Sequence, residues 1–501
     1  MLATTGRMSY GAQLARAARI DPRGVAFQIG DETRTYAELD DRASRVAGAL
    51  RDLGVGRGDR VALFLTNQPA FVEAFFAVAR LGAVVVPVNF RLVAAELAYI
   101  LDDSGSRVLI ADGTAADTVA AAARAGVTVV LTGEDYDALA GDPVTDVDVP
   151  ESDPLCILYT SGTTGRPKGA VLTHHALVMQ TVARIIAQRM GDAGEVWLSG
   201  FQLHHIGGLS SLLVSVMLRG RFISLRPGTT AAEIAGILVR ERVTTCSLTP
   251  THWAEVCRLP DVADRDFALR RISWGSMAST PGLLERMGEV FGDIDIYNLF
   301  GQTETASVTC TLSGPEARAN RGSAGRPILN VELRIVDDDM ADVGPGQVGE
   351  IVYRGPTVMR EYWRKPDATA AAFAGGWFPS GDLARRDDDG LIWIVDRKKD
   401  MIVSGGENIY CAEVEAVLSE HPEVAEVAVV GVPHERWGET PCAVVVPADP
   451  ERPPGLDELV AHCATRLASY KKPTAVRIVG ELPRNANGKV QKFRLRAETA
   501  G

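Results

Sequence analysis

The sequence has few cysteines, no excess of positive charge and no long uninterrupted apolar run. Its seven cysteines form no C-x-x-C pair and no metal-ligand spacing, so we expect buried, reduced thiols. The formal net charge of −12 argues against a nucleic-acid-binding protein. It also means that any site for an anionic ligand must gather its cations locally.

Membrane and export signals are also lacking. The most apolar long stretch, residues 206–218, is interrupted by glycine and serine and is shorter than the roughly 20 residues that span a bilayer. The first eleven residues hold one basic side chain and no apolar core, which predicts no signal peptide. We therefore expect a cytoplasmic protein, and the sequence leaves a peripheral membrane contact open.

The length of 501 residues predicts at least two domains, because one core rarely serves so long a chain. Strand-like and helix-like runs alternate from residue 36 to residue 131, which predicts layered α/β sheets with mostly parallel strands. The expected strands are 60–65, 83–88, 108–111 and 127–131, and the expected helices are 36–53, 69–81 and 94–102.

From about residue 348 the pattern of predicted strands and helices changes. Short β segments at 350–353 and 391–395 predict a β subdomain. A compact α+β unit is expected after residue 400, with helices at 413–420 and 456–469 and strands at 426–432, 442–447 and 475–479. We predict a large N-terminal domain at 1–396, a hinge at 397–399 and a small mobile C-terminal domain at 400–501.

The segment YTSGTTGRPKG at residues 159–169 concentrates hydroxyl groups, glycines and one lysine after an apolar run. Glycines let backbone N–H groups approach phosphate oxygens, hydroxyls donate hydrogen bonds and lysine adds a positive charge. The expected phosphate-binding residues are Thr160, Ser161, Gly162, Thr163, Thr164, Gly165 and Lys168. Because the lysine follows proline and residues 170–173 read as a strand, the loop joins two strands and is not a Walker A loop before a helix.

This loop resembles that of the adenylate-forming superfamily, which includes acyl-CoA synthetases, and the resemblance covers nearly the whole chain. The segments that carry it are the His205 region, FGQTE at 300–304, SGD at 380–382, DRKKDMIVSGGENIY at 396–410 and NGK at 487–489. The resemblance implies an ATP- and Mg²⁺-dependent ligase that makes an acyl-AMP and passes the acyl group to CoA, releasing pyrophosphate and AMP.

The resemblance also implies roles for the ATP-site residues. Phe300 would stack on adenine beside Gly301, Thr303 would contact the α-phosphate, and Glu304 would bind the metal, as suits a carboxylate and a hard cation. Gly275, Ser276 and Met277 match the adenine wall. Asp382 would accept hydrogen bonds from the ribose hydroxyls, because a carboxylate has lone pairs for two donors, and Arg397 would be the second ribose contact.

The resemblance implies that the C-terminal segments serve two half-reactions, formation of the acyl-AMP and transfer of the acyl group to CoA. Lys489 is similar to the catalytic lysine that bridges the acid and the α-phosphate. Lys399 falls at the hinge position. Ser404, Gly405, Gly406 and Glu407 would line the tunnel for the thin pantetheine arm of CoA.

The acyl pocket is where the chain departs from the family pattern. His205 matches the histidine near that pocket, and we expect a packed or gating residue instead of a general base, since a carboxylate needs no deprotonation at neutral pH. Gln202 and His204 stand where the family has proline and an aromatic residue, and Trp274 stands where it has glycine. We expect His204, His205 and Trp274 to line the pocket, with an acid larger than acetate because Gly301 leaves it open.

From the overall resemblance, a medium- or long-chain fatty acid is the first expected substrate. An aromatic acid is the alternative, because Trp274, Trp253 and His204 would form a flat slot. Two further alternatives are a ligase that loads a carrier protein and a catalytically silent nucleotide-binding sensor. The expected partners are a small carboxylic acid, ATP and CoA, with no nucleic acid, and a homodimer is left open.

Overall fold

The protein was analysed as a computed structural model. It describes residues 8–145, 148–160, 166–191, 194–275, 281–292, 294–320, 322–405, 407–464, 466–484 and 489–499. The chain packs as two compact units. Unit 1 comprises Met1–Leu333 and Tyr353–Phe378, and unit 2 comprises Arg334–Val352 and Pro379–Gly501.

The larger sheet of unit 1 has the strand order β15-β14-β13-β12-β11-β9-β10-β1-β2. Neighbours from β1 through β10, β9, β11, β12 and β13 are parallel, and the edge strands β2, β14 and β15 pair antiparallel. The strands are β1 (Val25–Ile29), β2 (Glu32–Thr35), β9 (Val196–Ser199), β10 (Arg221–Ser224), β11 (Thr245–Leu248), β12 (Arg271–Gly275), β13 (Asp295–Gln302), β14 (Ser307–Ser313) and β15 (Arg326–Pro327).

The second sheet of unit 1 has the order β18-β8-β7-β4-β3-β5-β6. Its parallel part ends at β7, which turns back into β8 as an antiparallel hairpin, and the short strand β18 pairs antiparallel with β8. The strands are β3 (Arg60–Phe64), β4 (Val84–Pro87), β5 (Val108–Ala111), β6 (Thr128–Leu131), β7 (Pro154–Thr160), β8 (Lys168–Thr173) and β18 (Glu361–Tyr362).

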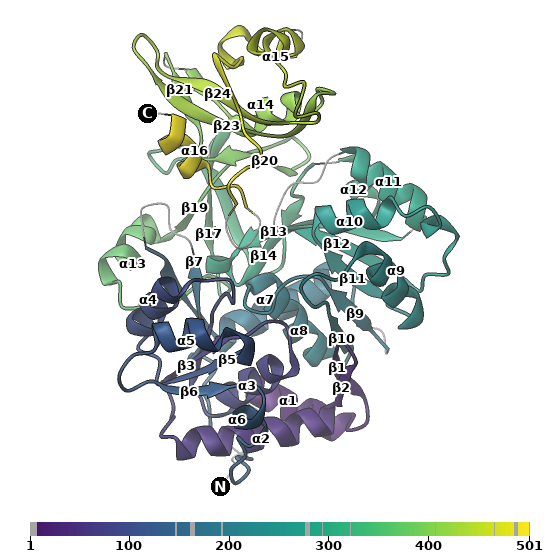
Figure 1. Ribbon diagram of the computed structural model, residues 1–501, viewed down its shortest axis with the longest axis vertical. Coiled ribbons are helices and arrows are strands. Elements are labelled where there is room, and N and C mark those ends of the chain that lie inside the picture. Colours follow the sequence, from purple (N-terminus) through teal and green to yellow (C-terminus); the bar gives the residue numbers. More distant parts are fainter. Residues whose placement is uncertain are drawn as a thin grey trace. The chain divides into compact units, whose positions relative to one another are not determined.

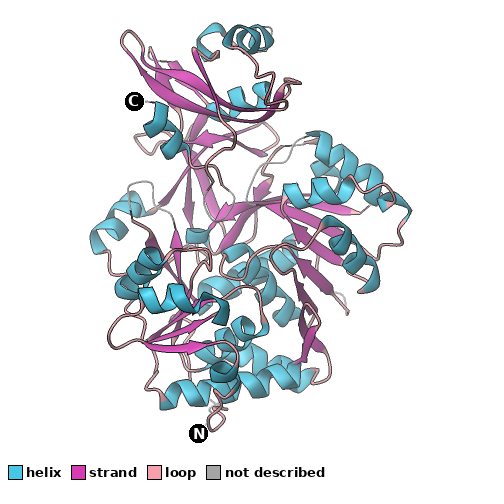
Figure 2. Cartoon of the chain, in the orientation of Figure 1, coloured by secondary structure: helices cyan, strands magenta, loops and turns pink. Residues whose placement is uncertain are grey.

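Helices flank the sheets of unit 1 (Figure 2). The entry to α2 shows why the sequence starts a helix there: the Glu38 N–H donates to Thr35 Oγ1 and the Thr35 N–H donates to Glu38 Oε2, a capping box. The helices are α1 (Tyr10–Ile20), α2 (Tyr36–Asp52), α3 (Pro69–Arg80), α4 (Ala94–Ser104), α5 (Ala116–Ala122), α6 (Glu134–Asp137), α7 (His174–Ala187), α8 (Ile206–Leu218), α9 (Ala231–Arg240), α10 (Pro250–Cys257), α11 (Pro281–Phe291), α12 (Gly314–Ala319) and α13 (Pro366–Ala372). Short 3₁₀ helices are η1 (Gly113–Ala115), η2 (Val262–Asp264), η3 (Thr303–Thr305) and η4 (Ala374–Gly376).

The two faces of the larger sheet bury different sets of side chains. Trp197 packs with Val214 of α8 and under Arg184 of α7, whose guanidinium carbon lies 4.7 Å from the indole centroid. The next residue, Leu198, points the other way into the core formed with α9, α10 and α11. Figure 1 shows these three helices along strands β9 to β12. Alternation along β9 therefore places successive side chains in two different cores.

Unit 2 contains a four-stranded sheet, β16-β17-β19-β20, and a five-stranded sheet, β22-β21-β24-β23 with β25 beside β24. The strands are β16 (Glu332–Val336), β17 (Val348–Arg354), β19 (Phe378–Arg386), β20 (Ile392–Arg397), β21 (Ile402–Ser404), β22 (Glu407–Ile409), β23 (Val424–His434), β24 (Gly438–Pro447) and β25 (Ala475–Ile478). The helices are α14 (Cys411–Leu418), α15 (Leu456–Cys463), the 3₁₀ helix η5 (Ser469–Lys471) and α16 (Lys492–Thr499).

The predicted fold class is confirmed, with layered α/β sheets, a β sheet and a smaller α+β portion. The expected β subdomain, which falls within the predicted N-terminal domain at 1–396, groups mainly with unit 2. The expected helix 456–469 was too long, because α15 ends at Cys463. Leu467 keeps helical spacing with Leu459 and Cys463 and packs in the same core, so the apolar pattern continues after the helix has ended. All seven cysteines are buried with free thiols. Within the described residues, the helices are too short or too polar to cross a membrane.

Candidate functional site

The predicted phosphate loop lies at the turn of the β7–β8 hairpin. Thr160 ends β7, Lys168 begins β8, and the two residues are cross-strand partners. The predicted connection of two strands is therefore confirmed. Ser161, Gly162, Thr163, Thr164 and Gly165 lie outside the described residues, so their phosphate contacts stay predictions.

Glu304 lies against this hairpin on η3. The Thr160 hydroxyl donates to Glu304 Oε1 over 3.1 Å, and the Tyr362 hydroxyl lies 3.4 Å from the same oxygen. Both of these hydrogen bonds of the carboxylate are made to the same oxygen, Oε1. A carboxylate beside a phosphate loop fits the ligand chemistry of Mg²⁺, which takes one or two carboxylates together with phosphate oxygens.

Tyr362 also contacts the lysine of the loop. The Lys168 ammonium lies 5.1 Å from the centroid of the Tyr362 ring, within the range of a cation–π interaction. Burial and the negative charge of Glu304 raise the pKa of the Tyr362 phenol. The phenol therefore stays protonated and acts as a hydrogen-bond donor at neutral pH.

The turn that carries Thr303 and Glu304 is strained. Ala306 has φ +58° and Ser307 has φ +115°, both unusual for residues with side chains. Just before them, the β13–β14 pairing shifts register between Phe300 and Gly301. A Cβ at Gly301 would lie 1.8 Å from the Ser307 carbonyl oxygen, so only glycine fits. Such strain clusters at functional sites, where the surrounding structure holds it in place.

The adenine-wall residues are described only in part. Gly275 ends β12 and pairs with Leu299, next to Phe300 on β13. A Cβ at Gly275 would lie 3.0 Å from the Leu299 carbonyl oxygen, which explains the glycine by close backbone approach. Ser276 and Met277 lie outside the described residues, so the adenine contacts stay predictions.

The predicted pocket histidines lie together before α8. His205 is the N-cap residue of α8, and its ring centroid lies 4.1 Å from that of His204. The edge of Phe90 packs against His204 at 5.5 Å. Burial, followed by the charges of His205 and Arg91, lowers the pKa of His204 well below its usual value, so His204 is neutral at pH 7.

The loop that carries these histidines is fixed by Asn67, a buried residue that the sequence reasoning missed. The Asn67 amide nitrogen donates to the Phe201 carbonyl and to the Ser224 hydroxyl, at 3.2 and 2.8 Å. The Asn67 amide oxygen accepts from the Leu203 N–H at 2.8 Å. Asn67 stands just before Pro69, where α3 begins. A polar residue ahead of a buried helix was the only local signal.

Trp274 and Trp253 lie in the core on the α9–α11 face of the larger sheet, whereas α8 lies on the opposite face. Trp253 is fully buried and donates from Nε1 to the Ser273 carbonyl at 3.0 Å. Trp274 is 3% exposed and lines a cavity of about 410 Å³ with Leu284 and Ile296. No described contact joins either tryptophan to the two histidines, so the role of Trp274 in the acyl pocket stays a prediction.

The predicted ribose-binding pair is assembled within unit 2. Asp382 on β19 and Arg397 on β20 are cross-strand partners. Arg397 Nε lies 2.8 Å from Asp382 Oδ1, and the aspartate side chain is 5% exposed. Both residues precede the predicted hinge residue Lys399, which is exposed and whose carbonyl oxygen accepts from Arg496 of α16 at 3.2 Å.

The residues predicted to serve CoA and the adenylation lysine also belong to unit 2. Ser404 and Glu407 are cross-strand partners of the β21–β22 hairpin. Gly405 has φ +58°, and a Cβ there would lie 2.6 Å from the Trp437 ring. Gly406 lies outside the described residues, and Lys489 is exposed next to Val490, which bridges to Arg484. The roles of these residues stay predictions, as do the hinge and domain limits at 397–399.

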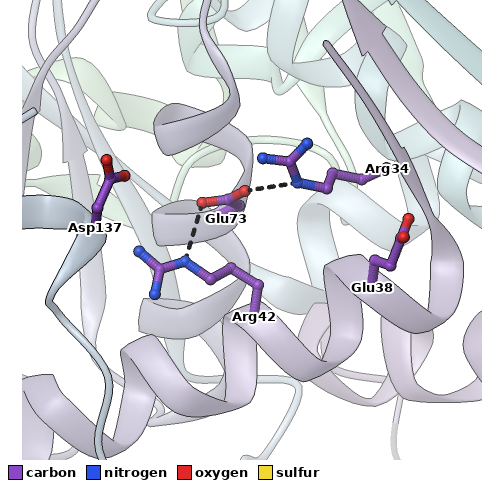
Figure 3. A pocket seen from close by; sticks show the side chains of 5 residues that line it. All are labelled: Arg34, Glu38, Arg42, Glu73 and Asp137. Atoms are coloured by element: carbon purple, nitrogen blue, oxygen red, sulfur yellow. Dashed lines mark hydrogen bonds and ion pairs between the residues drawn. The ribbon is translucent and has the colours of Figure 1, made fainter. Parts of the chain in front are cut away.

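A separate cavity of about 430 Å³ in unit 1 is highly charged (Figure 3). Its lining residues come from β2, α2, α3 and α6: Arg34, Glu38, Arg42, Glu73 and Asp137. Buried Glu73 is paired with both Arg34 and Arg42 at 3.4 Å. Arg42 also donates to the Tyr136 and Leu139 carbonyls. These bonds pair the charges of Glu73 and Arg42 within the protein, and a structural role explains them.

Comparison with known proteins shows the family to which the chain is similar. Residues 14–363 match the family model described as AMP-binding enzyme, and residues 413–489 match the AMP-binding enzyme C-terminal domain. A feruloyl-CoA synthase of Amycolatopsis sp is 40% identical over 487 residues, covering 97% of this chain and 98% of the relative. A long-chain-fatty-acid–CoA ligase of Mycobacterium tuberculosis is 36% identical over 504 residues, covering 98% of each. The solved o-succinylbenzoate–CoA synthetase of Bacillus subtilis with ATP and magnesium aligns with a TM-score of 0.87 at 32% identity, covering 97% of this chain and 98% of the other.

Proposed function

Because the chain belongs to the AMP-binding enzyme family, we propose that it joins an aromatic carboxylic acid with a polar ring substituent to CoA. Whatever its acid, the chain is an AMP-forming acid–thiol ligase. ATP and Mg²⁺ are required, and CoA is the acyl acceptor.

The chemistry follows from the poor reactivity of a free carboxylate. The acid oxygen attacks the α-phosphorus of ATP, the bond to pyrophosphate breaks, and the acyl-AMP then has a good leaving group. The CoA sulfur attacks the acyl carbon, and AMP leaves. Catalysis is mostly positioning and stabilisation of phosphate charge. We propose that Thr160, Thr303 and Lys168 bind phosphate oxygens.

Glu304 fits the metal role best among the described residues of the site. Its carboxylate lies beside the phosphate-loop hairpin, and its two hydrogen bonds fall on one oxygen. When bound there, Mg²⁺ supplies positive charge to the phosphates of ATP. Lys489, Asp382 and Arg397 are proposed to bind ATP as well, because they match the family's residues for that role.

Two polar departures from the family pattern support an acid with a polar substituent. Gln202 and His204 both carry buried polar atoms that have no hydrogen-bond partner among the described residues: Gln202 Oε1 and both ring nitrogens of His204. A buried polar atom without a partner costs about 1–3 kcal/mol. A polymethylene chain would leave these atoms unpaired, whereas a ring hydroxyl both donates and accepts. The neutral His204 offers one donor and one acceptor.

The phenyl ring of Phe90 beside His204 supports the aromatic part of the proposal. Aromatic side chains favour edge-to-face contacts with other rings at these distances. The similarity to a feruloyl-CoA synthase points in the same direction. A medium- or long-chain fatty acid is the second candidate, supported by the similarity to the long-chain-fatty-acid–CoA ligase.

A panel of acids tests the proposal by pyrophosphate release and by CoA-thioester formation. The panel pairs each hydroxylated aromatic acid with the same acid lacking the hydroxyl, and adds saturated fatty acids from eight to sixteen carbons. We expect the highest kcat/KM for a hydroxylated aromatic acid. Substitution His204→Phe should reduce the preference for the hydroxyl about tenfold. A fatty acid that reacts faster than every aromatic acid would overturn the proposal.

The variant Glu304→Gln distinguishes an error in the proposed substrate class from an error in the proposed metal-dependent reaction. A neutral amide binds a hard cation poorly, so this variant should lose most activity with every acid in the panel. If Glu304→Gln kept the wild-type rate at limiting Mg²⁺, the metal role of Glu304 would be wrong whatever the substrate.

A further inference from the structure

Tyr362 is in contact with two of the proposed ATP-site residues. Its hydroxyl lies 3.4 Å from Glu304 Oε1, and its ring lies under the Lys168 ammonium at 5.1 Å. One side chain thus contacts both the carboxylate assigned to the metal and the cation assigned to the phosphates. Both contacts are made within unit 1.

The backbone holds Tyr362 in this place from both sides. Tyr362 pairs with Ala170 across β18 and β8, and the Trp363 N–H donates to the Gly169 carbonyl at 2.7 Å. On the same segment, the Met359 N–H donates to the Glu304 carbonyl at 2.7 Å. The segment 359–363 therefore bridges the phosphate-loop hairpin and the turn that carries Glu304.

A third contact fixes the strand from the side of α13. The Tyr362 N–H donates to the Thr369 hydroxyl at 3.0 Å. These backbone bonds fix the position of the Tyr362 backbone, and the contacts of its hydroxyl with Glu304 and of its ring with Lys168 orient the side chain. The phenol hydroxyl donates to Glu304 Oε1 from this position, so it constrains the orientation of the carboxylate.

We propose that Tyr362 is a positioning residue for acyl-AMP formation: its hydroxyl orients the Glu304 carboxylate for the metal, and its ring positions the Lys168 ammonium for the phosphates. This inference rests on the ATP- and Mg²⁺-dependent reaction and is independent of the acid. Tyr362 acts through Glu304 and Lys168 and needs no contact with substrate.

The hydroxyl and the ring can be separated by two substitutions. Tyr362→Phe removes the hydroxyl and keeps the ring, so we expect the Mg²⁺ concentration for half-maximal pyrophosphate release to rise about fivefold, with a smaller change at saturating Mg²⁺. Tyr362→Leu removes both contacts and should weaken ATP binding by a further threefold or so. Tyr136→Phe is the matched control, because that buried phenol donates to the Ala70 carbonyl and should leave both values unchanged.

Binding of a non-hydrolysable ATP analogue, measured by calorimetry across a Mg²⁺ series, gives a readout that needs neither acid nor turnover. Tyr362→Phe should lower the affinity for the magnesium complex of the analogue, and it should have no further effect in a Glu304→Gln background. Equal analogue affinity in wild type and Tyr362→Phe would overturn the proposal. So would equal losses with and without Glu304, which would indicate general destabilisation.

Discussion

Asp382 and Arg397 face each other across β19 and β20, with Arg397 Nε 2.8 Å from Asp382 Oδ1. The aspartate is nearly buried while the arginine is about half exposed on its side-chain surface, at 43%. The pair therefore fixes the carboxylate and leaves the guanidinium partly accessible. This arrangement suits a carboxylate held ready to accept hydrogen bonds from two vicinal hydroxyls.

Asp382→Asn should raise KM for ATP about tenfold or more, because the amide replaces one acceptor with a donor and loses the charge that holds Arg397. The KM for the acid should change much less. Pyrophosphate release at varied ATP measures this, and Arg334→Gln is a control, because Arg334 pairs with Asp342 elsewhere in unit 2. Unchanged KM for ATP in Asp382→Asn would contradict the ribose role.

Asn67→Asp should disturb the loop that carries His204 and His205. The aspartate keeps an acceptor for the Leu203 N–H but loses the donor to Phe201 and Ser224. Since each lost buried hydrogen bond costs about 1–3 kcal/mol, we expect kcat/KM for the acid to fall at least tenfold. The affinity for the ATP analogue should stay near the wild-type value. Equal losses for acid and ATP analogue would mean that Asn67 stabilises the whole unit instead of this loop.

Trp274→Ala distinguishes core packing from an acyl-pocket role. As a core residue, Trp274 should cost about 3–5 kcal/mol of unfolding free energy when truncated, and the ranking of acids should stay the same. As a pocket residue, it should admit longer or bulkier acids. Chemical denaturation together with the acid panel separates the two, and a changed ranking with nearly unchanged stability would place Trp274 in the acyl pocket.

The buried ring of His174 should make the protein less stable in mild acid. Burial of the ring lowers its pKa to about 4 against the opposing charges of Asp153 and Glu151. Between the unfolded value of about 6.5 and the folded value, the unfolded chain binds the proton and the folded chain does not. Stability is therefore complete above pH 6.5 and falls as the pH drops toward 4.

The size of this effect is about 2 kcal/mol between pH 7 and pH 5 for one such histidine. The measurement is the free energy of unfolding at both pH values for wild type and His174→Asn, whose amide oxygen can accept from the Tyr10 N–H in place of His174 Nδ1. The variant should lose less stability over this interval. Equal pH dependence in the two proteins would show that His174 is not the responsible group.

Local sequence signals predicted the fold class and the ends of the phosphate-loop hairpin, because a strand, a turn and a second strand are consecutive in sequence. Thr160 and Lys168 were found in this way. Tyr362 was missed because its contacts with Lys168 and Glu304 depend on strand pairing across distant parts of the chain. Asn67 was missed for the same reason, since its partners lie on β10 and the loop before α8.

Trp274 shows a different limit of sequence reasoning. Its place at a family glycine suggested a pocket wall, which stays a prediction, and the direction of its side chain follows from alternation along β12. Ser273 hydrogen-bonds Ser247 on the α7–α8 side, at 2.7 Å, so Trp274 must point to the α9–α11 side. The sequence predicts that side chains along β12 alternate between the two faces of the sheet. It does not predict which helices cover each face.

Lys489 and the Ser404–Glu407 hairpin both lie in the predicted C-terminal domain at 400–501, although they are proposed to serve different half-reactions. A domain that serves adenylation and thioester formation in turn needs two orientations, and the predicted hinge at Lys399 is where the backbone would rotate. Lys399 is exposed, so substitution there changes no buried packing.

Lys489→Ala and Lys399→Pro should therefore fail in opposite half-reactions. Lys489→Ala should lose most acyl-AMP formation, about a hundredfold or more, because the transition-state charge loses its partner, yet it should convert supplied acyl-AMP and CoA to product. Lys399→Pro should form acyl-AMP but release little acyl-CoA, because proline fixes φ at the hinge and restricts rotation. Single-turnover assays of each half-reaction measure both effects. Equal losses in the two halves for both variants would exclude domain alternation at residues 397–399.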